Sequence, residues 1–297
     1  MSKRLKNLIV LHLIVLIFGY TGIWGKLISL DAVPLVWWRI AIALVSILLF
    51  TIFAKKLKAL TIQSALRFIG VGFIIAAHWI TFFWAIKVSN VSVALAVMAS
   101  TAFFISGLDP LISKKKFVWY ESILGIATII GLSIIFSFET KFLLGICLAL
   151  CSAFLAALFT VFNGLFVQKS DSYSITLWEM FGGLIFTSIY LFANGEFNPS
   201  FFYISTEDLK YLILLALLAT TIGFIASVKV MEVLSPFTVA LTVNLEPVYA
   251  IILAWIYFGE DEKMTWQFYL GTLIILSTIF INAYLKRNEK KKIDPEE

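Results

Sequence analysis

The segment Val93–Val97 (VALAV) returns 146 residues later as Val239–Val243 (VALTV), and this repeat decides how the chain is interpreted. At the same shift Leu124-Gly125 falls on Leu270-Gly271. An apolar pattern that recurs at a fixed distance indicates two copies of one structural unit. Apolar segments of low complexity also align by chance, so further evidence is needed.

The loops that follow these segments carry opposite charges. At the same shift, the three basic residues Lys114–Lys116 fall on the three acids Glu260–Glu262. A weaker match at a shift of 140 pairs Arg39 with Glu179, again with reversed charge. Repeats that keep their apolar pattern while a loop reverses its charge are typical of two halves facing opposite sides of a membrane. We expect these loops to mark orientation and to bind nothing.

The composition places most of the chain in lipid. Of the 297 residues 61% are hydrophobic and 14% are charged, whereas soluble domains carry about 25% charged residues. Continuous apolar runs favour helices over the alternating strands of a membrane barrel. Ten runs approach the length of a transmembrane helix: 7–27, 35–54, 66–86, 91–112, 118–138, 142–166, 174–193, 209–230, 236–258 and 266–285.

The sequence therefore predicts an all-α polytopic membrane protein with ten transmembrane helices. Because each half has an odd number of spans, the second half is inverted, which gives two inverted five-helix repeats. We assign residues 1–139 to the first repeat, 140–287 to the second and 288–297 to a charged cytoplasmic tail. The first run is long and lacks a small-residue cleavage site, so we expect a retained helix and not a signal peptide.

The basic residues predict the orientation. With both termini in the cytoplasm, 17 of the 23 Lys and Arg residues lie on the inner side. Positive residues gather on the cytoplasmic side, so we expect a multi-pass protein of the cell membrane with both termini inside. A net charge of +5 in such a chain does not indicate nucleic-acid binding. The six outer residues are Lys26, Arg39, Lys87, Lys141, Lys210 and Lys263.

Ionisable residues inside the predicted spans are the first functional candidates, because they are costly in lipid. Glu246 lies near the middle of the ninth run, directly before Pro247, which removes a backbone donor. It either binds substrate or a proton, or it bonds to neighbouring helices. His78 lies in the middle of the third run and could carry a proton, or it could be a neutral hydrogen-bonded histidine.

Further candidates suit an organic solute. Trp79 and Trp84 could form an aromatic wall, although Trp84 could instead belong to the interfacial aromatic belt. Arg39 could hold a carboxylate or extend to the outer surface. Asn163 and Asn244 offer neutral hydrogen bonds to substrate or between helices.

The sequence lacks the motifs that mark ATP-driven transport, zinc chemistry or hydrolysis. No phosphate-binding glycine loop, zinc motif or nucleophile elbow is present, so we expect neither an enzyme nor direct ATP drive. Cys147 and Cys151 with two histidines on other runs do not make a metal site, and we expect no metal and no cofactor. A channel would need a continuous polar pore, for which the spans have too few polar positions.

Four features together are similar to a known family: Gly22–Gly25 (GIWG), Arg39, Asn244–Pro247 (NLEP) and Gly259-Glu260. With the two five-helix repeats, residues 7–285 resemble the EamA family, the ten-helix type of the drug/metabolite transporter superfamily. The resemblance implies a transporter that moves small metabolites, often amino acids or their derivatives, out of bacteria. It also implies a cavity lined by spans 1, 3, 4, 6, 8 and 9.

The chain departs from that family at one point. Ser100-Thr101 stands where Glu246-Pro247 falls in the second half, whereas many relatives have proline in both halves. Symmetric hinging of the fourth and ninth spans therefore does not follow from the sequence.

We thus expect an exporter of amino acids or related organic solutes that works by alternating access. Transport is either facilitative or coupled to protons through Glu246 or His78. The alternatives are a nucleotide-sugar or sugar-phosphate carrier, which should have several cations in its cavity, and a membrane-embedded enzyme. The expected partners are a small-molecule substrate and the lipid bilayer; a monomer suffices and an oligomer is possible.

Overall fold

The computed structural model describes residues 3–56, 60–114, 116, 118–138, 140–243 and 245–293, and these residues form helices joined by short loops. The first half contains α1 (Lys3–Gly19), α2 (Thr21–Leu27), α3 (Ala32–Phe53), α4 (Ile62–Val88), α5 (Val91–Met98), α6 (Thr101–Ser113) and α7 (Trp119–Phe138).

The second half contains α-helices together with 3₁₀ segments and one π-helix. They are η1 (Thr140–Phe142), α8 (Leu143–Phe166), α9 (Ser172–Ala193), η2 (Pro199–Phe202), α10 (Thr206–Leu214), the π-helix η3 (Leu215–Phe224), α11 (Ile225–Val230), α12 (Pro236–Val243), α13 (Glu246–Phe258), η4 (Gly259–Glu262) and α14 (Trp266–Ile293).

Seven helical segments of the described chain are long and apolar enough to cross a membrane. They correspond to the first four predicted runs and to the sixth, seventh and eighth. The other three predicted runs lie on α7, on α12 with α13, and on α14. The structure therefore confirms an all-helical, multi-pass membrane protein.

Two predicted spans are interrupted at corresponding places. The fourth is divided into α5 with 8 residues and α6 with 13, and the ninth into α12 with 8 residues and α13 with 13. In the first half hydroxyl groups bond to the preceding turn, since Ser100 Oγ donates to the Val97 carbonyl at 2.8 Å and Thr101 Oγ1 to that of Met98 at 2.7 Å. Such bonds compete with the helical pattern. The first half thus has its break without a proline.

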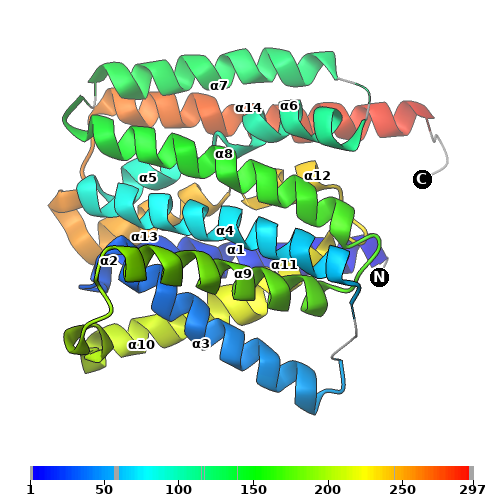
Figure 1. Ribbon diagram of the computed structural model, residues 1–297. Helices are drawn as coiled ribbons and strands as arrows, with labels where there is room; N and C mark the ends of the chain where they lie inside the picture. Colours follow the sequence, from blue (N-terminus) through cyan, green and yellow to red (C-terminus); the bar gives the residue numbers. More distant parts are fainter. Residues whose placement is uncertain are drawn as a thin grey trace.

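The long helices run side by side, and α1 begins at the same end of the bundle at which α14 ends (Figure 1). Helix α4 packs against α8 and α9, and α7 packs against α14. Glycines bring α4 and α9 together, because a Cβ added to Gly72 would overlap the backbone of Glu179. Small residues at helix crossings allow such close approach in membrane proteins.

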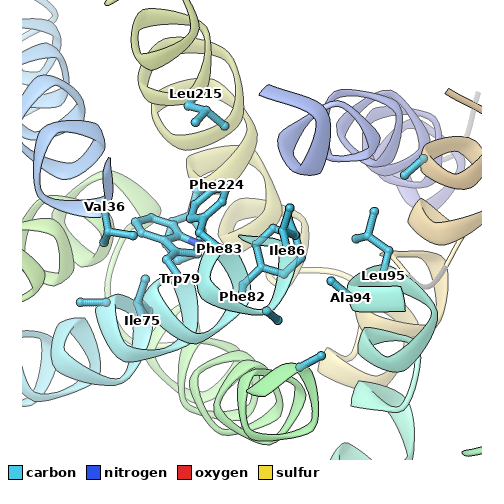
Figure 2. Packing of buried hydrophobic residues seen from close by; sticks show 14 of the residues in the cluster. Val36, Ile75, Trp79, Phe82, Phe83, Ile86, Ala94, Leu95, Leu215 and Phe224 are labelled. Atoms are coloured by element: carbon cyan, nitrogen blue, oxygen red, sulfur yellow. The ribbon is translucent and has the colours of Figure 1, made fainter. Parts of the chain in front are cut away.

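The buried core surrounds α4. Figure 2 shows its Trp79 between Val36 of α3 and Phe224 of η3, and Phe83 of the same helix is fully buried. Large apolar side chains instead face outward on α3 and α14, such as Val45 and Leu273. In a multi-pass membrane protein these outward faces are covered by lipid.

Candidate functional site

A cavity of about 130 Å³ lies among α1, α3, α4, the α5–α6 break, α8, η3, α11 and the α12–α13 break. Both halves of the chain therefore contribute to its wall. Aromatic and aliphatic side chains make up most of the lining, which is typical of a small-molecule site with a few polar groups. The polar lining residues are Thr21, Arg39, His78, Thr101, Thr160, Asn163, Ser227 and Glu246.

Arg39 is held within this wall and does not extend to the surface. Its side chain is 4% exposed, and its guanidinium carbon lies 3.9 Å from the centre of the Trp79 ring. Arg39 Nε donates a hydrogen bond of 2.8 Å to Thr220 Oγ1. A planar guanidinium stacked on an aromatic face and fixed through Nε keeps its other donors for a ligand.

The π-helix η3 positions Thr220, the hydrogen-bond partner of Arg39. Within η3 the hydroxyl of Thr220 donates to the Leu215 carbonyl at 3.0 Å, and that of Thr221 to the Ala216 carbonyl at 2.9 Å. Both bonds reach back five residues, as the wider π-helical turn allows. π-Helical turns inside α-helices are frequent at functional sites, and this one places Thr220 against Arg39.

Glu246 begins α13 and lines the same cavity. Its Oε1 accepts a long hydrogen bond of 3.4 Å from Thr21 Oγ1, which also donates to the Phe18 carbonyl at 2.7 Å. Glu246 also interacts electrostatically with Arg39. The cavity therefore presents an acid from the second half and a base from the first half of the chain.

His78 is anchored to α8. Its Nδ1 lies 3.0 Å from the Ser152 carbonyl oxygen and 2.8 Å from the Ser152 hydroxyl. Because a carbonyl oxygen only accepts, the first contact places a hydrogen on Nδ1, and Nε2 is then the acceptor of the neutral ring. The ring also packs near Phe82 and Phe159. His78 thus has a structural role and also lines the cavity.

The remaining predicted site residues do not all line the cavity. Trp79 and Asn163 line the cavity, whereas Trp84 does not belong to the lining and is 47% exposed. Five residues after Trp79, Trp84 points about 140° away around the same helix, and a role for it in substrate binding stays a prediction. Asn244 lies outside the described residues.

One acid that the sequence singled out only as the repeat partner of Arg39 lies behind the cavity wall. Glu179 is 0% exposed, and its Oε2 accepts a hydrogen bond of 3.5 Å from Asn163 Nδ2. Because Asn163 lines the cavity, Glu179 is one residue away from it. The signal in the sequence was a carboxylate within an apolar span, which is costly in lipid.

The acidic loop makes contacts within the protein in addition to its predicted role of marking orientation. Glu262 is 1% exposed, and its Oε1 lies 2.9 Å from Lys26 Nζ. The same carboxylate accepts backbone hydrogen bonds from Val91 at 3.1 Å and Ser92 at 2.9 Å, at the start of α5. We call Lys26, Val91, Ser92 and Glu262 the Glu262 latch. It ties α2 and α5 of the first half to η4 of the second.

The latch and the deepest polar lining lie toward opposite ends of the bundle. Helix α2 ends next to Lys26 at one end, and α8 ends just after Asn163 at the other (Figure 1). The cavity also reaches Met231, which follows α11. The structure therefore joins the halves at one end and extends the cavity toward the other.

Comparisons with known proteins agree on the class of protein. Residues 143–284 match the model of the EamA-like transporter family. An uncharacterized transporter of Clostridium kluyveri is 24% identical over 71% of this chain and 70% of its own length. The uncharacterized transporter YdfC of Bacillus subtilis is 23% identical over 93% of this chain and 89% of its own length.

A solved crystal structure has the same fold. It superposes with a TM-score of 0.69 over 95% of this chain and 99% of the other, at 11% sequence identity. With the seven apolar helices, the family match and the two relatives support a multi-pass membrane transporter.

Proposed function

We propose that the protein transports amino acids or related small organic solutes by alternating access. The observation that carries this proposal is the cavity that holds Arg39 from one half and Glu246 from the other. A zwitterionic solute presents a carboxylate, which suits the guanidinium, and an ammonium group, which suits the carboxylate. The Trp79 ring and neighbouring apolar side chains would pack against the rest of the solute.

The lining disfavours the phosphate-bearing alternative. Among its residues Arg39 is the single lysine or arginine, and Lys229 lies exposed outside the lining. A nucleotide-sugar or sugar-phosphate carrier needs more than one cation to neutralise its substrate. The proposal therefore remains with neutral or zwitterionic solutes.

The proposed architecture is ten transmembrane helices in two inverted five-helix repeats. Paired helix lengths support it: α3 and α9 each have 22 residues and follow an aspartate, Asp31 and Asp171. The divided helices α5–α6 and α12–α13 also have matching lengths. The start of α1 and the end of α14 lie at the same end of the bundle, which suits an even number of crossings (Figure 1). The positive-inside bias would place that side in the cytoplasm.

Alternating access then gives the two ends of the bundle different roles. The Glu262 latch would close the outer end while the cavity approaches the inner end, as in an inward-facing state.

Transport is either facilitative or proton-coupled, and Glu246 and His78 are cavity groups that could exchange a proton with solvent. Export is the proposed direction. The protein would act in the cell membrane, and no partner chain is needed to complete the cavity.

A transport screen tests the proposal. Purified protein is reconstituted into liposomes loaded with a mixture of the twenty isotopically labelled proteinogenic amino acids, and their release is measured by mass spectrometry. We expect selective release of one or a few amino acids, faster than from protein-free liposomes. A second set of liposomes is loaded with a mixture of sugar phosphates. If the protein does not speed the release of any amino acid but does speed the release of sugar phosphates, the result favours the alternative carrier.

A further inference from the structure

Three buried oxygen atoms at the junction of α8 and α9 have no hydrogen-bond partner in the described part of the chain. They are Glu179 Oε1, Asn163 Oδ1 and Thr176 Oγ1. All three residues are 0% exposed. Unpaired buried polar atoms are rare in folded proteins, and a cluster that includes a carboxyl group is therefore a candidate functional site.

Glu179 is fully buried, with no exposed surface. The backbone of α4 lies directly against the backbone of Glu179 at Gly72, where any side chain would overlap the Glu179 carbonyl group. Its one bond, to Asn163, joins it to the cavity lining. Asn163 therefore connects the Glu179 carboxyl group to the cavity.

The cationic groups on the helices packed against α9 are engaged elsewhere or face outward. Arg39 of α3 bonds to Thr220, and Lys87 of α4 donates to the Ile28 carbonyl at 3.0 Å. Arg67 of α4 and Lys229 of α11 are exposed. The other titratable side chains on these helices are His78, bound to Ser152, the exposed Cys147 and Cys151 of α8, and Tyr173 and Tyr190 of α9 itself.

An ionised carboxylate in this place would be very unfavourable. Isolated buried charges cost far more than buried neutral groups, and they are neutralised by a proton or a paired cation instead. A proton needs no ligands besides the carboxyl oxygen. A magnesium or calcium ion would need about six or more oxygen ligands, whereas the described residues at this place offer three unpaired oxygens, those of Asn163, Thr176 and Glu179. The geometry therefore favours a proton.

We propose that Glu179 is a proton-binding site of the transporter, loaded and unloaded through the substrate cavity past Asn163. The step forms one O–H bond on Glu179 from a hydronium ion or acid in the cavity and breaks it on release. A substrate that draws Asn163 toward itself would weaken a hydrogen bond that favours the ionised carboxylate of Glu179, and would therefore link substrate binding to proton uptake. This inference rests on the proposed transport function for its coupling and on geometry alone for the site.

Infrared difference spectroscopy tests the site without any substrate. A protonated carboxyl group in an apolar environment has a distinct C=O stretching band, which disappears on ionisation. We expect this band to titrate with pH in the wild type, to be absent from Glu179→Gln and to be retained in Glu179→Asp, Glu246→Gln and the exposed control Glu232→Gln. A band that is lost in Glu246→Gln and retained in Glu179→Gln overturns the proposal.

Transport tests the coupling. The substrate is an amino acid identified by the screen. An imposed pH gradient should change the transport rate of the wild type. Glu179→Gln should still exchange the amino acid, but its rates with and without the gradient should be in a ratio of about one. An unchanged response in Glu179→Gln overturns proton coupling at this site. A response to a sodium gradient that Glu179→Gln abolishes would also overturn it. A screen without any substrate would count against the transport function, while the infrared titration still decides whether Glu179 binds a proton.

Discussion

At the scale of single residues, Arg39 shows how packing decides between two positions that the sequence leaves open, the cavity wall and the membrane surface. Placed eight residues into α3, it could have extended to the membrane surface. Stacking on Trp79 and the bond to Thr220 instead hold it in the cavity wall. Neither contact is visible in the sequence, because the three residues lie on three different helices.

We predict that Arg39→Lys weakens substrate binding although it keeps the charge. Lysine cannot stack as a plane or present the guanidinium fork. Loss of one charged hydrogen bond costs about 1.5–3 kcal/mol, which corresponds to a half-saturation concentration raised roughly 10- to 100-fold. The measurement is the concentration dependence of transport in proteoliposomes.

Arg67→Lys is the matched control, because Arg67 is exposed on α4 and lies outside the cavity lining. It should transport like the wild type. An unchanged half-saturation concentration in Arg39→Lys would remove Arg39 from the binding site.

At the scale of helices, the close crossing of α4 and α9 depends on glycine. The backbones meet at Gly72 and Gly182, where an added Cβ would overlap the partner helix. At this crossing Gly72 lies against the backbone carbonyl of Glu179. The sequence shows the glycines but not which of them lie at a crossing, since that depends on how distant helices pack.

We predict that Gly72→Ala lowers the free energy of unfolding by about 1–3 kcal/mol, because overpacking pushes the two helices apart. Gly70→Ala lies on the same helix with nothing within 4 Å of the added Cβ, so it should be neutral or slightly stabilising. Thermal unfolding in detergent measures both. Equal unfolding temperatures for the two variants would contradict the close α4–α9 contact.

The Glu262 latch joins three elements at the other end of the cavity from Asn163. Its residues lie far apart in the sequence, at positions 26, 91, 92 and 262. Three acids in a row would all suit an exposed turn. Two of them do, since Glu260 and Asp261 are exposed, but Glu262 is buried.

We predict that Glu262→Gln opens the latch end of the cavity. Charge-assisted bonds contribute about 1.5–3 kcal/mol each, so loss of the charge should raise access roughly tenfold. The measurement is the rate at which a membrane-impermeant thiol reagent labels Met98→Cys from outside in a background lacking Cys147 and Cys151.

Glu260→Gln is the control for this experiment. Its carboxylate is 80% exposed and pairs with Lys263 at 3.1 Å, and exposed pairs contribute little. Labelling at the wild-type rate in both variants would show that the latch does not close the cavity.

At the scale of the whole molecule, the sequence predicted the helical class and the approximate span positions because continuous apolar runs of this length have few other solutions. It missed the break between α5 and α6, where hydroxyl groups act in place of proline, and the π-helix η3, where threonines bond five residues back. Arg39, His78, Trp79, Asn163 and Glu246 do meet in one cavity. Their partners depend on packing between distant segments, which one sequence does not specify.

The central claim is that two halves of opposite orientation enclose one substrate cavity. The most direct measurement places single cysteines in the two loops of opposite charge, as Lys116→Cys and Glu260→Cys, in a background without Cys147 and Cys151. A membrane-impermeant thiol reagent is then applied to intact and to permeabilised cells. We predict that Glu260→Cys is labelled in intact cells and Lys116→Cys only after permeabilisation. Labelling of both cysteines from the same side would contradict the inverted repeat.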